Sequence, residues 1–309
     1  MKEPVKACVV GAGLMGHGIA QTFAQAGHQV ALFDIDEKRR ELALSRIEQN
    51  LQQLGEEPSG VLANISLCSE LSQAAADVDI VIEAVSEVLG LKQEVFEALS
   101  HLAPSDAILS SNTSVIPITA IGEKLDDAAR SRLVGTHWWN PPHLIPLVEI
   151  IRTEYTAEEV FNATFDLMAS LGKKPVKVLM DVPGFIGNRL QHAMWREALH
   201  LVTTGVCDAE TIDVVVKNSF GLRLPYLGPM ENADLVGLTL TQQVHKFIFP
   251  HLCNDASASS LVDELLDAGH QGMESGRGLK TWSHQQAVSL RHQLSHRLID
   301  TLGANDNNK

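Results

Sequence analysis

The sequence predicts an α/β fold, with a doubly wound parallel sheet in the first part of the chain and an all-α domain in the second. Three observations carry this prediction. A chain of 309 residues has the length of about two domains. Runs rich in Val and Ile alternate with helix-period stretches in the first half. After Asp181 the strand pattern almost disappears and helical patterns take over.

The apolar runs of the first part lack polar alternation, which is typical of parallel strands covered by helices on both faces. We predict strands over residues 5–10, 29–33, 79–85, 107–110, 133–136, 146–151 and 176–179. Helices are predicted between them over residues 15–26, 37–54, 91–100 and 157–171. Strands and helices in alternation imply a sheet wound on both faces.

A Pro-Gly pair, Pro183–Gly184, stands where the pattern changes and suits a hinge between two domains. We therefore predict domains over residues 1–182 and 183–309. The second has helical patterns over residues 185–204, 209–219, 239–249, 258–268 and 282–302. Their wide apolar faces predict a homodimer formed through this helical domain.

Composition excludes several classes of protein. Hydrophobic residues make up 45% and charged residues 20%, the balance of a globular protein with a sizeable core. The net charge of −14 repels nucleic acid and anionic lipid, and the sequence has no basic patch to offset it. The first residues lack the pattern of a signal peptide. The four cysteines lie far apart, without metal-ligand spacing, so we expect no metal site and a cytoplasmic protein.

A glycine motif follows the first predicted strand. Gly11, Gly13 and Gly16 form G-x-G-x-x-G at the start of a helix, with Leu14 and Met15 inside the loop. Such a loop lets a pyrophosphate approach the backbone at a helix N-terminus. Asp34 ends the second strand, 21 residues after Gly13, where a carboxylate binds ribose hydroxyls and repels a 2′-phosphate. The motif thus predicts a Rossmann-type domain that binds NAD rather than NADP.

Four further segments occur in a fixed order. They are Ser111-Asn112-Thr113-Ser114, Gly135-Thr136-His137-Trp138-Trp139-Asn140-Pro141-Pro142, Leu147-Val148-Glu149, and Asp181-Val182-Pro183-Gly184-Phe185-Ile186-Gly187-Asn188-Arg189-Leu190. With the glycine loop, this order resembles the 3-hydroxyacyl-CoA dehydrogenase superfamily as far as about Leu238. The resemblance implies a Rossmann domain, a helical C-terminal domain that forms the dimer, and NAD-dependent oxidation of a secondary alcohol.

The resemblance also implies roles for single residues. His137, at a strand end on the carboxyl edge of the sheet, takes the hydroxyl proton as hydride leaves. Glu149, which the Pro141–Pro142 turn can return beside it, fixes the imidazole tautomer. Ser114 and Asn188, one from each predicted domain, bind the reacting oxygen. The matching positions for cofactor contacts are Glu87, Lys92 and Asn112.

Simpler interpretations of these residues stay open at this stage. The chain has 13 histidines, and His143 is a rival base in the same loop. Glu149 can be a surface charge at a strand end, and Asn188 an ordinary amide on a helix. The two tryptophans after His137 suit packing as well as stacking on a substrate.

The sequence departs from the acyl-CoA enzymes in two places. Between residues 41 and 91 only Arg46 is basic, so little positive charge is available there for the phosphates of CoA. Arg223, in Gly221-Leu222-Arg223-Leu224-Pro225-Tyr226-Leu227-Gly228-Pro229, is similar to the branch of lambda-crystallin, gulonate dehydrogenase and carnitine dehydrogenase. A lone arginine suits bidentate capture of a small carboxylate. An ion pair with Glu231 or Asp234 is the structural alternative.

We therefore predict an NAD-dependent dehydrogenase that takes hydride from a small carboxylate-bearing hydroxy compound. A 3-hydroxyacyl-CoA dehydrogenase is the first alternative. The second is oxidation of a hydrated aldehyde on a carboxylated aromatic substrate, in which His137 deprotonates the hydrate. The third is a non-catalytic NAD-binding structural protein, against which the intact set of Ser114, His137, Glu149 and Asn188 argues.

Overall fold

The computed structural model describes residues 4–306 and divides into two compact units. The first contains the chain up to Arg189 together with its last segment from Leu298, and the second is Leu190–Arg297. The predicted division into residues 1–182 and 183–309 stays a prediction.

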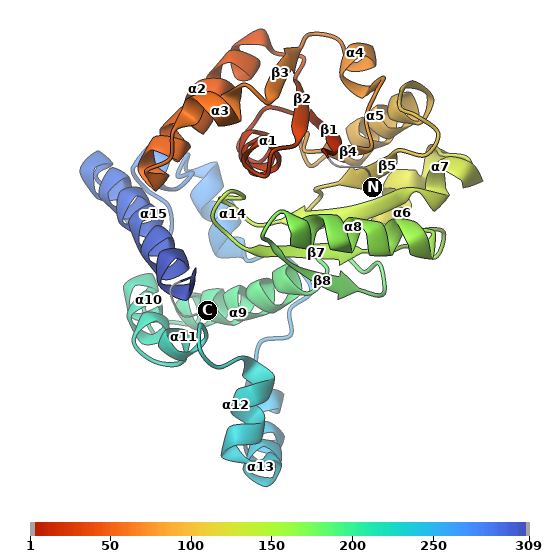
Figure 1. Ribbon diagram of the computed structural model, residues 1–309. Helices are drawn as coiled ribbons and strands as arrows, with labels where there is room; N and C mark the ends of the chain where they lie inside the picture. Colours follow the sequence, from red (N-terminus) through yellow and green to blue (C-terminus); the bar gives the residue numbers. More distant parts are fainter. Residues whose placement is uncertain (1–3, 307–309) are drawn as a thin grey trace. The chain divides into compact units, whose positions relative to one another are not determined.

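The first unit is built on one eight-stranded sheet (Figure 1). Its spatial order is β3-β2-β1-β4-β5-β6-β7-β8. The first six strands are parallel, β7 runs antiparallel to β6, and β8 is parallel to β7. The bounds are β1 (Lys6–Val10), β2 (Gln29–Phe33), β3 (Ile65–Cys68), β4 (Ile80–Glu83), β5 (Ile108–Ser111), β6 (Leu133–Trp138), β7 (Leu147–Ile151) and β8 (Lys174–Val178).

Helices and one short 3₁₀ turn connect these strands. Asp36 caps the longest of them, α2, by accepting from the Lys38 N–H, and Gly55 ends it in a left-handed conformation. The elements are α1 (Gly16–Gln25), α2 (Glu37–Leu54), α3 (Pro58–Leu62), α4 (Leu71–Ala75), α5 (Leu89–Leu102), α6 (Ile118–Ile121), η1 (Gly122–Lys124), α7 (Asp127–Ser131) and α8 (Glu158–Ser170). Figure 1 shows α8 along β7 and β8.

Two buried apolar clusters cover the two faces of the sheet. Successive residues of β1 alternate between them, since Val9 belongs to one cluster and Cys8 and Val10 to the other. Side chains of α1, α2 and α8 complete the first cluster, and side chains of α4, α5, α6 and α7 complete the second. Burial on both faces explains why the strands lack polar alternation. The predicted doubly wound sheet is confirmed, with its last two strands reversed.

The second unit, all of which is described, contains helices and only isolated β-bridges. Helix α9 begins in the first unit, and α15 ends there. The elements are α9 (Gly187–Thr203), α10 (Ala209–Lys217), α11 (Phe220–Arg223), α12 (Pro229–Val236), α13 (Leu238–Ile248), η2 (Phe249–His251), α14 (Ser260–Asp267), η3 (Met273–Ser275) and α15 (His284–Asp306). The predicted helical second part is thereby confirmed.

Two further observations bear on the sequence expectations. All four cysteines are free, with Cys8 and Cys68 buried and Cys207 and Cys253 half-buried. Between residues 4 and 306, no helix combines the length and the apolar character that a membrane crossing requires.

Candidate active site

The glycine loop between β1 and α1 has the shape that a dinucleotide requires. Gly11 has a φ of 106°, and a Cβ there would lie 2.6 Å from the Ala84 carbonyl oxygen. A Cβ at Gly16 would lie 1.7 Å from the Gly11 carbonyl, so only glycine lets α1 pack this close. A Cβ at Gly13, by contrast, would meet no described atom within 4 Å. The loop therefore leaves room for a pyrophosphate at the N-terminus of α1.

A cavity of about 440 Å³ lies beside this loop. The buried Asp34 carboxylate is held at its edge, because Oδ2 accepts from the Ala12 N–H and Oδ1 from the Asp36 N–H, both at 2.9 Å. A fixed carboxylate here suits the adenosine ribose. Leu14 and Ile35 are exposed apolar walls. The predicted cofactor residues that line the cavity are Gly11, Gly13, Leu14, Met15 and Asp34.

Cofactor choice gives a first prediction. Because the Asp34 carboxylate repels a 2′-phosphate, NAD should exceed NADP in kcat/KM by at least about 10²-fold. Asp34→Ser should lower this ratio by about 10- to 100-fold, since one charged contact is lost. Arg39 also lines the cavity, so steady-state kinetics with both cofactors are needed to separate the two charges. Asp36→Ser is the matched control, because serine preserves the cap of α2. Comparable kcat/KM for NAD and NADP in the unchanged protein would contradict the prediction.

A buried charge network lies under the loop after β5. Lys92 Nζ is 2.8 Å from Glu83 Oε1 and 3.3 Å from Glu87 Oε2, and Lys92 and Glu83 are almost inaccessible. Glu87 Oε1 accepts from the Thr113 hydroxyl and from the Ser114 N–H. Burial raises the pKa of Glu87, but these hydrogen bonds and the Lys92 charge outweigh it and hold the pKa below its usual value. The network positions Ser114, and contact of Glu87 and Lys92 with a nicotinamide ribose stays a prediction.

His137 and Glu149 face one another across the antiparallel pair β6–β7. The register pairs the two residues, and His137 Nδ1 lies 2.7 Å from Glu149 Oε2. Both side chains are buried. Among residues 4–301, whose side chains the structure describes, the Nε2 atom of His137 has no hydrogen-bond partner, so it is free to accept a proton from a substrate. The rings of Trp139 and Phe185 flank the imidazole at centroid distances of 5.2 and 5.7 Å.

Glu149 is fixed from a second side by the start of α9. Its Oε1 accepts from the N–H groups of Ile186 and Gly187 at 2.9 and 3.0 Å. Phe185 adopts a φ of 50°, rare for a side-chain-bearing residue, immediately before these two donors. Burial raises the pKa of Glu149, but the hydrogen bonds from His137, Gly187 and Ile186 outweigh it, so the net pKa lies below its usual value. The carboxylate is therefore ionised near neutral pH and orients the His137 ring.

Two other predicted site residues meet through a backbone contact. Asn188 Nδ2 donates to the Ser114 carbonyl at 2.9 Å. Asn188 and Ser114 both lie in the first compact unit, which extends to Arg189. In the described part of the chain the Ser114 hydroxyl has no partner, which leaves it available for a substrate oxygen. Asn112 Oδ1 accepts from the Trp138 N–H and so ties β5 to β6.

The alternative base, His143, lies in a different environment. Its Nδ1 is 3.5 Å from the Asn50 amide nitrogen of α2, and no carboxylate pairs with it among residues 4–306. Burial, together with His17 and Lys173, lowers its pKa to about 4. Trp138 is fully buried in the core, whereas Trp139 packs against Gly187. His137, with its carboxylate partner, is thus the better placed of the two histidines for general base catalysis.

His143 gives a prediction about stability. With a pKa of about 4 when folded and about 6.5 when unfolded, the unfolded chain binds more protons between these values. The free energy of unfolding should therefore fall as the pH is lowered from 6.5 towards 4. His143→Asn should make this fall in the free energy of unfolding smaller by about 1–2 kcal/mol, a value reduced because the His143 side chain is partly exposed. Urea unfolding at pH 7 and pH 5 measures it, and identical pH slopes for both proteins would contradict it.

Arg223 is the last residue of α11 in the helical unit, and its side chain is exposed. Glu231 and Asp234, the ion-pair partners that the sequence suggested, do not bind the Arg223 guanidinium. Glu231 accepts instead from the Gly228 N–H, and no ion pair joins Arg223 to Glu231 or Asp234 in the described chain. The guanidinium is accordingly available for a ligand.

Three residues that contribute to the site were not predicted from the sequence. Glu83 and Ser111 anchor the network with Lys92, since the Ser111 hydroxyl donates to Glu83 at 2.6 Å. An acidic residue ending the buried run Ile80–Glu83 was the available signal, because a carboxylate there needs a buried cation. Phe185 was missed because nothing in the sequence marks a non-glycine residue for positive φ.

Both parts of the chain match domains of a known protein family. The 3-hydroxyacyl-CoA dehydrogenase NAD binding domain matches residues 6–182, and the 3-hydroxyacyl-CoA dehydrogenase C-terminal domain matches residues 184–282. A probable 3-hydroxybutyryl-CoA dehydrogenase of Bacillus subtilis is 36% identical over 278 residues, 87% of this chain and 94% of that protein.

Relatives of a second kind act on a pyridine. The 5-formyl-3-hydroxy-2-methylpyridine 4-carboxylate 5-dehydrogenase of Mesorhizobium japonicum is 35% identical over 295 residues, 94% of this chain and 95% of that protein. A crystal structure of an enzyme of this name, described as an NAD⁺-dependent dismutase, has a TM-score of 0.89 at 34% identity and covers 96% of both chains.

Proposed function

Because the chain belongs to the 3-hydroxyacyl-CoA dehydrogenase family, and is an NAD-dependent dehydrogenase, we propose that His137 is the base that starts its reaction. The observation that carries this proposal is the pairing of His137 Nδ1 with the Glu149 carboxylate at 2.7 Å, which leaves Nε2 free. NAD, when bound, supplies the acceptor for a hydride. We propose that the oxidised carbon bears both a hydroxyl group and a hydrogen.

The proposed roles follow from the contacts. His137 Nε2 takes the hydroxyl proton while the hydrogen leaves the same carbon with its electron pair, so a carbonyl forms. Glu149 keeps the proton of the resting imidazole on Nδ1 and stabilises the imidazolium that forms. The Ser114 hydroxyl and the Asn188 amide position the reacting oxygen. The Ser114 N–H donates to Glu87 and the Asn188 amide donates to the Ser114 carbonyl, so these contacts hold the Ser114 backbone and the Asn188 side chain in place before substrate arrives.

We propose a small carboxylate-bearing substrate, either a secondary alcohol or the hydrate of an aldehyde. Oxidation of a hydrate converts an aldehyde into a carboxylic acid, with the same proton transfer to His137. A carboxylated aromatic aldehyde is the compound to test first. The pyridine carboxylate relative supports this choice, since it aligns with 94% of this chain, and so does the unpaired Arg223. We propose that Arg223 binds the substrate carboxylate.

A 3-hydroxyacyl-CoA is the second candidate substrate, favoured by the 36% identity to the probable 3-hydroxybutyryl-CoA dehydrogenase. The scarcity of basic residues between 41 and 91 argues against it, because CoA carries several negative charges. A purely structural role is disfavoured by the network around His137 and Glu149, which holds two buried titratable groups in place.

An NADH-forming absorbance screen tests the proposal. Its substrates are small hydroxy acids and carboxylated aromatic aldehydes, each with a matched compound that lacks the free carboxylate, and 3-hydroxybutyryl-CoA. Turnover that depends on the carboxylate supports the proposed substrate class. Turnover confined to the CoA thioester would replace it with the second candidate.

We also propose a homodimer formed through the helical unit, and a location in the cytoplasm. The four free cysteines suit a reducing compartment. Helices α12 and α13 expose large apolar side chains, among them Met230 at 74% and Phe247 at 76%. So much exposed apolar surface is typical of a protein interface.

The assembly gives a further prediction. Light scattering at micromolar concentration should give twice the chain mass of 33.6 kDa. Phe247→Asp should shift the mass towards one chain, because it places a charge in the apolar face. Lys217→Asp, on α10, is a matched exposed control that should leave the mass unchanged. A single-chain mass for the unchanged protein would contradict the prediction.

A further inference from the structure

Three side chains of different chemistry converge within the helical unit. They are His200 of α9, and Cys253 and Asp255 in the segment after η2. One imidazole nitrogen, the thiol sulfur and one carboxylate oxygen all lie within 4.8 Å of one another. The imidazole and the thiol are half-buried, and the carboxylate is exposed. The cluster is built from residues that have no part in the site at His137.

None of these three side chains has a hydrogen-bond or ion-pair partner among residues 4–301, whose side chains the structure describes. They also make no hydrogen bond to one another, although an imidazole, a thiol and a carboxylate this close offer both donors and acceptors. Ligands of one tetrahedral ion with bonds of about 2.0–2.3 Å lie about 3.3–3.8 Å apart. The largest separation in the cluster, at most 4.8 Å, exceeds that spacing by no more than about 1.5 Å.

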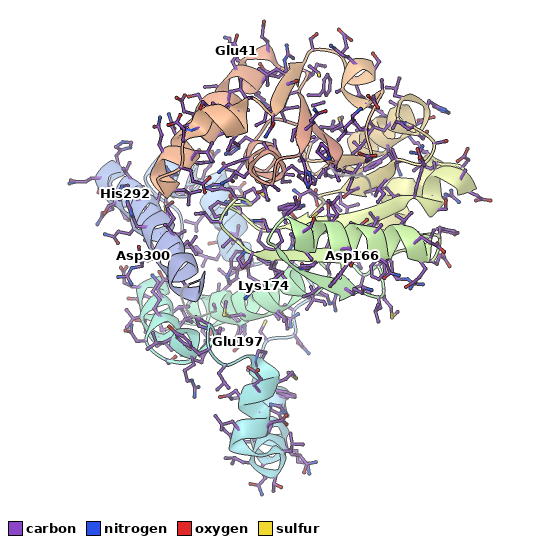
Figure 2. The ribbon with its side chains drawn as sticks, viewed as in Figure 1. Glu41, Asp166, Lys174, Glu197, His292 and Asp300 are labelled. Carbon is purple, nitrogen blue, oxygen red and sulfur yellow. The ribbon has the colours of Figure 1, made fainter. Side chains whose placement is uncertain are left out.

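The backbone that carries two of the three ligands is held against α9 by separate contacts. Glu197, labelled in Figure 2, lies one helical turn before His200 and accepts from the Cys253 N–H at 2.7 Å. Arg196 Nη1 donates to the Asp255 carbonyl oxygen at 3.3 Å. Cys253 and Asp255 are thus placed beside His200 without using their side chains. These backbone contacts leave the thiol and the carboxylate free to bind a ligand.

We propose that His200, Cys253 and Asp255 form a site for a divalent transition-metal ion, with Zn²⁺ as its characteristic occupant. A mixed nitrogen, sulfur and oxygen set suits Zn²⁺ and excludes Mg²⁺ and Ca²⁺, which prefer oxygen alone. Binding releases the thiol proton of Cys253, so that a Zn–S bond forms and the proton goes to solvent. Water completes four-coordination. The ion ties the segment 253–255 to α9 within the helical unit.

The sequence does not indicate this metal site, and the spacing of the cysteines predicts no metal site. Metal sites that are visible in sequence place ligand pairs a few residues apart, whereas His200 and Cys253 are separated by 53 positions. Only the return of the chain through α13 and η2 brings them together.

Metal titration of the full-length chain tests the proposal. After treatment with a chelator, the protein is titrated with Zn²⁺ against a chromophoric zinc indicator. We expect one equivalent bound per chain, and an affinity lowered by at least about tenfold in His200→Ala and in Cys253→Ser. Cys207→Ser, which removes the other half-buried thiol of the unit, is the matched control and should bind like the unchanged protein. The proposed site would be overturned if Zn²⁺ showed no saturable binding. It would also be overturned if His200→Ala and Cys253→Ser bound Zn²⁺ as tightly as the unchanged protein.

A second measurement uses the unchanged protein and does not depend on the folding of a variant. Zn²⁺ should slow alkylation of Cys253 by iodoacetamide, followed by peptide mass spectrometry, while alkylation of Cys207 continues at its original rate. Mg²⁺ should protect neither. Co²⁺ should give a thiolate-to-metal charge-transfer band that is present in Cys207→Ser and absent in Cys253→Ser. Equal alkylation of Cys253 with and without Zn²⁺ would exclude a metal–sulfur bond.

Discussion

His137→Asn is expected to lower kcat by about 10²–10⁴-fold on the best substrate, while NAD affinity, measured by titration, stays within about twofold. The reason is that proton removal by a positioned base contributes this much to rate. His137 lies outside the residues that line the cavity beside the glycine loop. His143→Asn is the matched control, since it removes the histidine between β6 and β7 and should keep most of the activity. Near-full activity in His137→Asn would remove this residue from the role of base.

Glu149→Gln sharpens this prediction because it changes the tautomer of His137. Glu149 Oε1 accepts from two backbone N–H groups, of Ile186 and Gly187, whereas Oε2 faces His137 Nδ1. In glutamine the carbonyl oxygen must stay with the two donors, so the amide NH₂ faces Nδ1. The imidazole then carries its proton on Nε2 and cannot accept another from the substrate.

The expected result for Glu149→Gln is a loss of kcat similar to that of His137→Asn, with little change in KM. The two changes should not add, because they disable the same base. Kinetics of the two single variants and the double variant measure this. Losses that multiply in the double variant would show that Glu149 acts independently of His137.

The alternation of strands and helices was predictable because burial on both faces leaves a strong apolar signal in each strand. The missing strand, β3, shows the limit of that signal. It has four residues, of which the middle two are exposed, and it lies at the edge of the sheet. An edge strand buries fewer side chains, so its composition does not differ from that of a loop. The Pro141–Pro142 turn predicted that the chain reverses and returns beside His137, and the antiparallel pairing of β7 with β6 agrees with this, although the apolar pattern of β7 itself did not indicate its direction.

The candidate site was predictable where chemistry depends on residue type and order, as for the glycine loop, Asp34 and His137. The Pro141–Pro142 turn indicated that Glu149 returns beside His137, but the exact register of the two strands was not predictable. Glu149 lies opposite His137 only because β6 and β7 pair antiparallel in that register. The anchoring of Glu149 by two backbone donors likewise needs the positive φ of Phe185. The identity of a side chain can be read from the sequence, whereas the position of a backbone N–H donor depends on the fold.

The prediction for Arg223 separates the two candidate substrate classes. If the substrate has a free carboxylate, the guanidinium binds that charge equally in the ground state and in the transition state. Arg223→Ala should then mainly raise KM, with a smaller fall in kcat from lost orientation. Charge-assisted hydrogen bonds to a desolvated carboxylate contribute about 2–4 kcal/mol, which is roughly 30- to 1000-fold in kcat/KM.

Two further variants make the result specific to the geometry of arginine. Arg223→Lys should recover only part of the activity, because an ammonium group does not reproduce the planar fork that binds both carboxylate oxygens. Arg291→Ala removes an exposed arginine of α15 and should change kcat/KM by less than about twofold. An acyl-CoA substrate presents a thioester where the carboxylate would be, so Arg223→Ala should then matter little. A change below about threefold, with 3-hydroxybutyryl-CoA as the best substrate, would assign the enzyme to the acyl-CoA class.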